Sequence, residues 1–144
     1  MNKSKTSLVL MELIVTILFF SLASAVCVQL FVRSHLITQE TKELNEAINI
    51  TQSVCEVMNG TDGSLSAIQA YYPDAAGDND YFVIYYDENY NETADFENAS
   101  YAADVTVSSV SRLYNLDVKF VRLSDMEEIY SLNASKYIRR KPDN

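Results

Sequence analysis

Glu12 is the residue with the clearest chemical meaning in this chain. It is the single charged residue in the apolar run 8–32, which Arg33 closes. A carboxylate inside a membrane helix costs about 2.5–3.5 kcal/mol on insertion scales, so such a residue needs a functional reason and a partner. Glu12 is the fifth residue counted from Leu8, and Leu8 follows the small residue Ser7. This spacing suggests where the partner comes from.

A cut between Ser7 and Leu8 would create a new α-amino group, which is cationic near neutral pH. In a bundle of parallel helices, Glu12 of one copy could then meet the Leu8 amine of the next. At about 4 Å and an effective dielectric constant near 20, the attraction is roughly 4 kcal/mol, enough to offset the insertion cost. The chemistry expected of Glu12 is therefore charge pairing between copies.

The other reactive side chains form no catalytic constellation. The chain has one histidine, His35, and two cysteines, Cys27 and Cys55. It contains no nucleophile elbow, phosphate-binding loop or paired cysteine and histidine ligand set. The two cysteines would lie about 42 Å apart on one helix, too far for a disulfide within the chain. We expect no catalytic residue and no cofactor, and we interpret the chain as a non-enzyme.

One acidic loop offers hard oxygen ligands. Asp74, Asp78 and Asp80 are weak candidates for calcium, although they lack the spacing and the terminal glutamate of an EF-hand loop. A solvated acidic loop is the favoured interpretation, and no other metal site is predicted.

Composition narrows the function further. The 144 residues are 48% hydrophobic and include three glycines and two prolines, which excludes a disordered or collagen-like chain. Eleven basic against twenty acidic residues give a net charge of −9. There is too little positive charge to neutralise phosphates, so no nucleic-acid partner is expected.

The apolar run predicts a membrane-spanning helix. As a helix, residues 8–32 would be about 37 Å long, and a bilayer core is about 30 Å thick. Lys3 and Lys5 favour a cytoplasmic N-terminus. Two alternatives stay open: a secretory signal cleaved after Ala25, and a plain single-pass anchor.

The helical pattern continues beyond the membrane and ends at Asn59 and Gly60. Steps of three and four residues predict a seam that packs on the rest of the protein. The seam consists of Ile37, Thr41, Leu44, Ile48, Thr51, Cys55 and Met58.

The remainder predicts a small antiparallel sheet. Asp62 and Ser64 can cap a short helix that Pro73 ends. Residues 81–86 favour a strand, and alternation around 103–110, 114–120 and 128–138 predicts further strands. We expect three or four strands, with one face on the helix seam and the other in solvent.

Residues 7–15, Ser-Leu-Val-Leu-Met-Glu-Leu-Ile-Val, resemble the N-terminal signature of type IV pilins and of the pseudopilins of type II secretion and competence systems. The resemblance implies that a prepilin peptidase cuts after Ser7, that Leu8 is N-methylated, and that Glu12 forms the assembly salt bridge. The chain departs from the family pattern at Ser7, where glycine is usual, at Leu8, where phenylalanine is usual, and at Gln29, where many pilins have proline.

The resemblance implies a pilin-like α+β fold, in which a long N-terminal transmembrane-plus-amphipathic helix packs on a small antiparallel β-sheet. The expected parts are a basic leader (1–7), a transmembrane half-helix (8–32), an extracytoplasmic amphipathic half-helix (33–59) and a β-rich globular domain (60–144).

The expected function is that of a structural subunit, of minor type, in a type IV pilus or a secretion or competence pseudopilus. The implied partners are other pilin or pseudopilin subunits, the prepilin peptidase, the inner-membrane assembly platform and membrane lipid. The implied location is the cell membrane, crossed once, with an extracytoplasmic C-terminal domain and filaments at the cell surface. The alternatives are an envelope-anchored binding protein that does not polymerise and a secreted protein cut after Ala25.

Overall fold

The computed structural model describes residues 2–78 and 81–138, with side chains from residue 5 onward. The chain divides into two compact units between Thr41 and Lys42, and each unit is considered by itself.

The described residues of the first unit, 2–41, are all helical. They belong to α1 (Asn2–Gly60), whose segment from Lys5 onward is long and apolar enough to cross a membrane. The hydroxyls of Thr16, Ser21 and Ser24 donate to carbonyl oxygens one turn earlier, at 2.8–2.9 Å. These bonds satisfy the hydroxyls within the helix itself, as an apolar surrounding requires. The predicted uninterrupted helix is confirmed, including its passage through Gln29.

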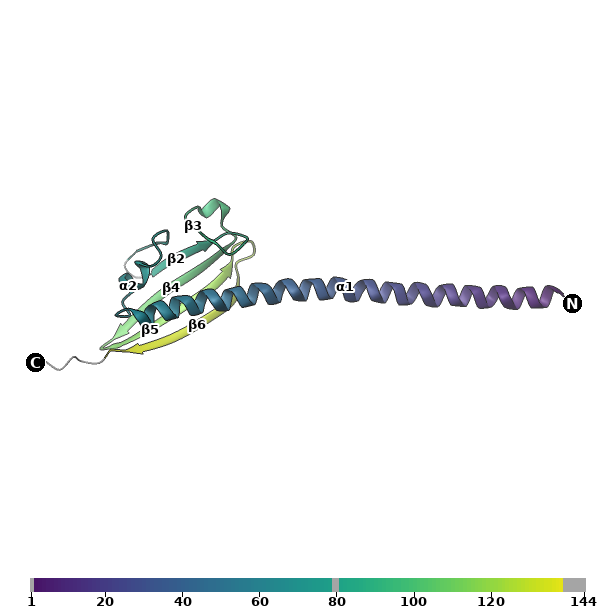
Figure 1. Cartoon of the computed structure of the whole chain (residues 1–144), viewed down its shortest axis with the longest axis horizontal. Helices are drawn as coiled ribbons and strands as arrows, with labels where there is room; N and C mark the ends of the chain where they lie inside the picture. The colour runs from purple at the N-terminus through teal and green to yellow at the C-terminus, as the bar shows by residue number, and fades with distance from the viewer. Residues whose placement is uncertain (1, 79–80, 139–144) are drawn as a thin grey trace, which may run out of the picture. The chain divides into compact units, whose positions relative to one another are not determined.

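The second unit is built on one antiparallel sheet (Figure 1). Its strand order is β1-β2-β4-β5-β6, and β3 pairs with β2 away from this path. The strands are β1 (Ala76–Gly77), β2 (Tyr81–Tyr86), β3 (Glu92–Thr93), β4 (Tyr101–Val110), β5 (Leu113–Arg122) and β6 (Glu127–Tyr137). The expectation of three or four strands holds for the four long ones. It misses β1 and β3, because two-residue strands carry no alternation to detect.

Two short helices accompany the sheet, α2 (Leu65–Gln69) and the 3-10 helix η1 (Phe96–Asn98). The Ser64 hydroxyl accepts a hydrogen bond from the Ala67 amide and so caps α2, as predicted. Asp62 accepts from the Ser64 amide at 2.9 Å. Between them, Gly63 has a φ of +80°, a conformation that side chains disfavour.

The core lies between the C-terminal part of α1 and one face of the sheet (Figure 1). Alternate residues of the strands point into it, as the period of two requires. Its members from α1 are Ala47, Val54 and Met58, and its members from β2, β4 and β5 are Phe82, Ile84, Tyr86, Ala103, Val105, Leu116, Val118 and Phe120. The α+β arrangement of a long N-terminal helix packed on an antiparallel sheet is therefore present, and it is consistent with a pilin-like fold.

The predicted helix seam is confirmed in its C-terminal part and is rotated by about one residue at the start of the second unit. Thr51 and Met58 are buried and Cys55 packs against the core, but Leu44 is 40% exposed. The buried stripe instead includes Glu43, Ala47 and Val54. Hydrophobicity alone places a glutamate on the solvent side, whereas here an ion pair holds Glu43 in the interface.

In the sequence, Lys136 and residues 139–141 suggest a basic C-terminal tail, but the structure gives Lys136 a structural role. It lies in β6, and its Nζ donates to the carbonyl oxygens of Met58 and Asn59 at 2.9 Å and to that of Thr61. Lys136 thus satisfies carbonyls that the end of α1 leaves without helical partners. The rest of that tail, residues 139–141, lies outside the described residues.

Candidate functional site

Glu12 lies on the surface of α1 among exposed apolar side chains, including Val9 and Leu13 at 65% and 58% exposure. Its backbone carbonyl accepts the Thr16 hydroxyl at 2.8 Å. Within the described part of the first unit, the Glu12 carboxylate makes no hydrogen bond or ion pair, so its charge is available to a partner outside the chain.

The predicted cleavage bond, Ser7–Leu8, lies in α1 with both residues exposed. Leu8 and Glu12 are four residues apart, which places them on one helix face. Of the predicted leader, residues 2–7 are helical and residue 1 lies outside the described residues, as does the Lys3 side chain.

The structure gives the calcium candidates no common site. Asp74 and Asp78 lie near β1, and Asp80 lies outside the described residues. Among the residues that are described, no group of three histidine, cysteine or acidic side chains is placed to hold a metal ion. Asp74 instead adds to a burial effect that raises the pKa of Glu92.

The remaining reactive side chains have local contacts only. Nε2 of His35 is 3.3 Å from the Gln39 amide nitrogen, one turn along α1. Cys27 and Cys55 are free thiols. None of these contacts assembles a catalytic arrangement.

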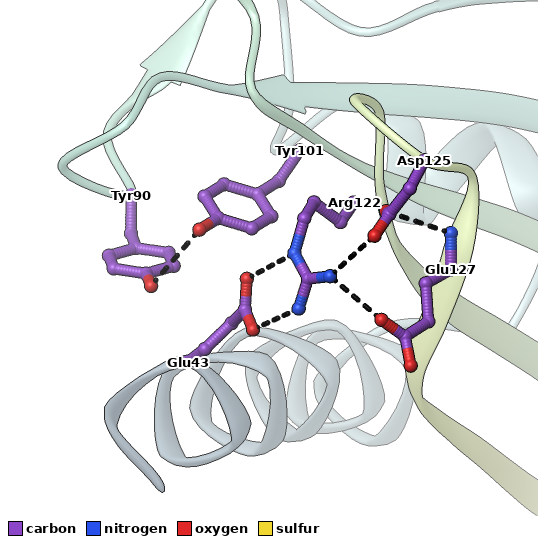
Figure 2. Close-up of polar contacts among 6 residues, drawn as sticks. All are labelled: Glu43, Tyr90, Tyr101, Arg122, Asp125 and Glu127. Carbon is purple, nitrogen blue, oxygen red and sulfur yellow. Dashed lines mark hydrogen bonds and ion pairs between the residues drawn. The ribbon is translucent and has the colours of Figure 1, made fainter. Parts of the chain in front are cut away.

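Arg122 organises the most elaborate polar cluster of the second unit (Figure 2). Its Nε donates to Oε1 of Glu43 at 2.8 Å, and its Nη2 donates to Oε2 of the same carboxylate. Its Nη1 donates to Asp125 at 2.8 Å and to Glu127 at 2.7 Å. Arg122 therefore ties α1 to both the β5–β6 turn and the start of β6.

An aromatic stack lies beside this cluster (Figure 2). The rings of Tyr90 and Tyr101 stack with centroids 4.9 Å apart, and Tyr101 stacks on Phe120 at 5.5 Å. Lys42 Nζ lies 5.7 Å from the centre of the Tyr90 ring, within cation–π range. Burial raises the pKa of Tyr101, with hydrogen bonds to Tyr90 and Glu43 adding to the effect. The stack and the ion pair together fix the first turns of α1 in this unit against the sheet.

The Glu43–Arg122 pair predicts a pH dependence of stability. The Arg122 hydrogen bond lowers the pKa of Glu43 below its ordinary value of 4.5, although burial opposes the shift. The stability that this pair contributes is therefore complete above that ordinary value and is lost as the pH falls through the folded-state pKa.

We expect a Glu43→Gln variant to be less stable than the parent at pH 7 and to lose less stability on acidification. Urea unfolding of the full chain between about pH 7 and pH 3 measures this difference. Equal slopes of stability against pH for parent and variant would contradict the assignment. Glu40→Gln, on the exposed side of the same helix, is the matched control.

Sequence reasoning missed Arg122 because no local signal marks it. Its partner Glu43 is 79 residues away, and a lone arginine in an alternating strand looks like an ordinary surface residue. Only the folded structure brings the two together.

Comparison of the chain with protein-family models, with curated proteins and with solved structures finds no match. The functional argument therefore rests on the chain's own residues.

Proposed function

We propose that the chain is a structural subunit, of minor type, in a type IV pilus or a secretion or competence pseudopilus, assembled through its N-terminal helix. The observation that carries the proposal is Glu12, an unpaired acid on an apolar helix that is long enough to cross a membrane. An anchor or a signal peptide gains nothing from such an acid, whereas a self-assembling helix does.

In the proposed mechanism, an ion pair between neighbouring subunits fixes their stagger along the filament. Removal of residues 1–7 makes Leu8 the first residue of the helix, with a cationic amine. A second copy, staggered along the filament, then places its Glu12 against that amine, and the apolar side chains around both groups exclude water. In that setting the pair contributes roughly 4 kcal/mol, so subunits that are out of register are disfavoured.

The second unit supplies the sheet that the assembled subunit places outside the membrane. Its sheet is rigidly joined to the last turns of α1 through the core, Lys136 and Arg122. The sheet therefore moves together with the last turns of α1. The N-terminus is then cytoplasmic, the sheet extracytoplasmic, and the membrane platform and peptidase are the implied partners.

Processing of the leader tests the proposal. Co-expressed with a prepilin peptidase, the parent chain is expected to lose residues 1–7. Ser7→Gly, which restores the residue usual in the family, should be cut more completely. Ser7→Glu should not be cut, because a bulky charged side chain replaces the small residue before the bond. Intact mass distinguishes the products.

Ala25→Tyr is the control for these variants. It removes the small residue that a signal peptidase would require and should leave cleavage after Ser7 unchanged. A product that begins at Val26, and that disappears in Ala25→Tyr, would contradict the proposal and establish the secreted alternative.

A further inference from the structure

The sheet has a second face, directed away from the core, that carries a shallow hollow of about 340 Å³. Among the residues that the structure describes, five line the hollow: Tyr81, Asp104, Thr106, Asp117 and Lys119. A volume of this size lies at the lower end of the range of about 300–1,000 Å³ that small-molecule pockets occupy.

The strand register explains why these five side chains meet. Tyr81 of β2 pairs with Thr106 of β4, which pairs with Asp117 of β5. In the next row on the same face, Asp104 of β4 pairs with Lys119 of β5. Because side chains alternate between faces, the two rows lie two residues apart on one side of the sheet.

The polar side-chain atoms of the hollow form no hydrogen bond or ion pair with residues 5–78 and 81–138. Asp104 and Lys119 stand directly opposite each other, yet their charged atoms form no ion pair. On the same face, Asn115 and Ser135 do pair with each other, at 2.7 Å. Partial burial raises the pKa of Asp104 even though Lys119 opposes the shift, while the side chain stays exposed and so accessible to a ligand.

The chemistry of the lining selects a class of ligand. Tyr81 is half exposed and offers a flat apolar ring. The two carboxylates accept hydrogen bonds, the ammonium of Lys119 donates them, and the Thr106 hydroxyl does both. Two acids and one base give these groups a net charge of −1, which disfavours an anion, and the mixed donors and acceptors suit a ligand with many hydroxyls and one apolar face.

We propose that this hollow binds one neutral pyranose ring of a carbohydrate, with the sugar's C–H face on Tyr81 and its hydroxyls between Asp104, Asp117 and Lys119. This inference goes beyond the proposed function and does not depend on it, because an anchored or a secreted protein would use the same face.

Titration of the full chain in detergent micelles, followed by amide NMR, tests the inference. The probes are methyl glucoside, methyl galactoside and N-acetylglucosamine. We expect saturable shifts with at least one of them, confined to the amides around Tyr81, Thr106 and Asp117, with dissociation constants of order 1 mM, which is about 4 kcal/mol. A linear tetrasaccharide of the sugar that binds distinguishes a polysaccharide ligand from a free monosaccharide. Tighter binding than the monomer assigns the site to a polymer, and equal binding assigns it to a single sugar.

Variants identify the site. Tyr81→Ala and Asp117→Asn should each weaken binding at least tenfold, while Asn133→Ala, an exposed neighbour in the same row on β6, should leave it unchanged. The amide spectra report whether each variant is folded. Absence of saturable shifts with all three sugars, shifts located elsewhere, or stronger binding of glucuronate or ethanolamine than of the neutral sugars would overturn the proposal.

Discussion

Replacing Glu12 with alanine is expected to leave the chain in the membrane and to abolish its incorporation into filaments. Insertion should become easier, because the variant no longer carries a carboxylate that costs about 2.5–3.5 kcal/mol in a membrane helix. Assembly should fail, because each contact loses roughly 4 kcal/mol of charge attraction. That loss corresponds to about a thousandfold in the association constant of each contact.

The measurement is the ratio of assembled to membrane-resident protein in cells that express the whole assembly machine. Thr16→Val is the matched control, since it removes a hydroxyl one turn away that bonds only the Glu12 carbonyl and leaves the carboxylate in place. Filaments that contain the Glu12→Ala chain at the parent's level would remove the basis of the proposed mechanism and would favour the non-polymerising anchor.

Replacing Phe120 with alanine is expected to be the most damaging single change in the second unit. Its side chain is fully buried near the C-terminal end of β5. Its ring packs against Tyr86 at 5.9 Å and against Tyr101 at 5.5 Å between centroids. Removing a buried phenylalanine leaves a cavity and costs about 3–5 kcal/mol, a large part of the stability of a unit this size.

Urea unfolding followed by tyrosine fluorescence measures this loss, because the chain has ten tyrosines and no tryptophan. Phe96→Ala is the control. Phe96 is 63% exposed and touches Tyr85 edge to face, so its replacement should cost about 1 kcal/mol or less. Similar losses in the two variants would mean that the core is not centred on Phe120.

Much of this fold is predictable from the sequence, for identifiable reasons. The apolar run and the lack of glycine or proline before Gly60 determine α1. Alternation around 103–110 and 114–120 predicts β4 and β5, which extend to residues 101–110 and 113–122. The turn before β6 is also recognisable from its polar residues Ser124 and Asp125. Each of these patterns involves residues that are close in the sequence. Predictions from such local patterns are correct where the tertiary packing favours the same structure.

The errors come from interactions between distant residues. The helix seam is rotated because Glu43 is buried, and Glu43 is buried because Arg122 pairs with it. Lys136 is part of the fold because the end of α1 presents carbonyl oxygens to β6. Neither partner can be recognised before the chain is folded, since each pair is separated by nearly 80 residues.

The same distinction applies to the two candidate sites. Glu12 is visible in the sequence because an isolated charge in an apolar run is itself a local signal. The hollow on the open face is not visible, because it depends on the register that aligns Tyr81, Thr106 and Asp117 across three strands. A shift of one residue in that register would send alternate side chains to the opposite face.

The most direct test of the central claim is the mature N-terminus of the protein isolated from its own membrane. Each interpretation specifies a different first residue, and N-terminal sequencing together with intact mass identifies it. We predict a chain that begins at Leu8 and is one methyl group heavier than residues 8–144. A chain that begins at Met1 would have no amine at Leu8, and a chain that begins at Val26 would have lost Glu12 itself, so either result would contradict the account.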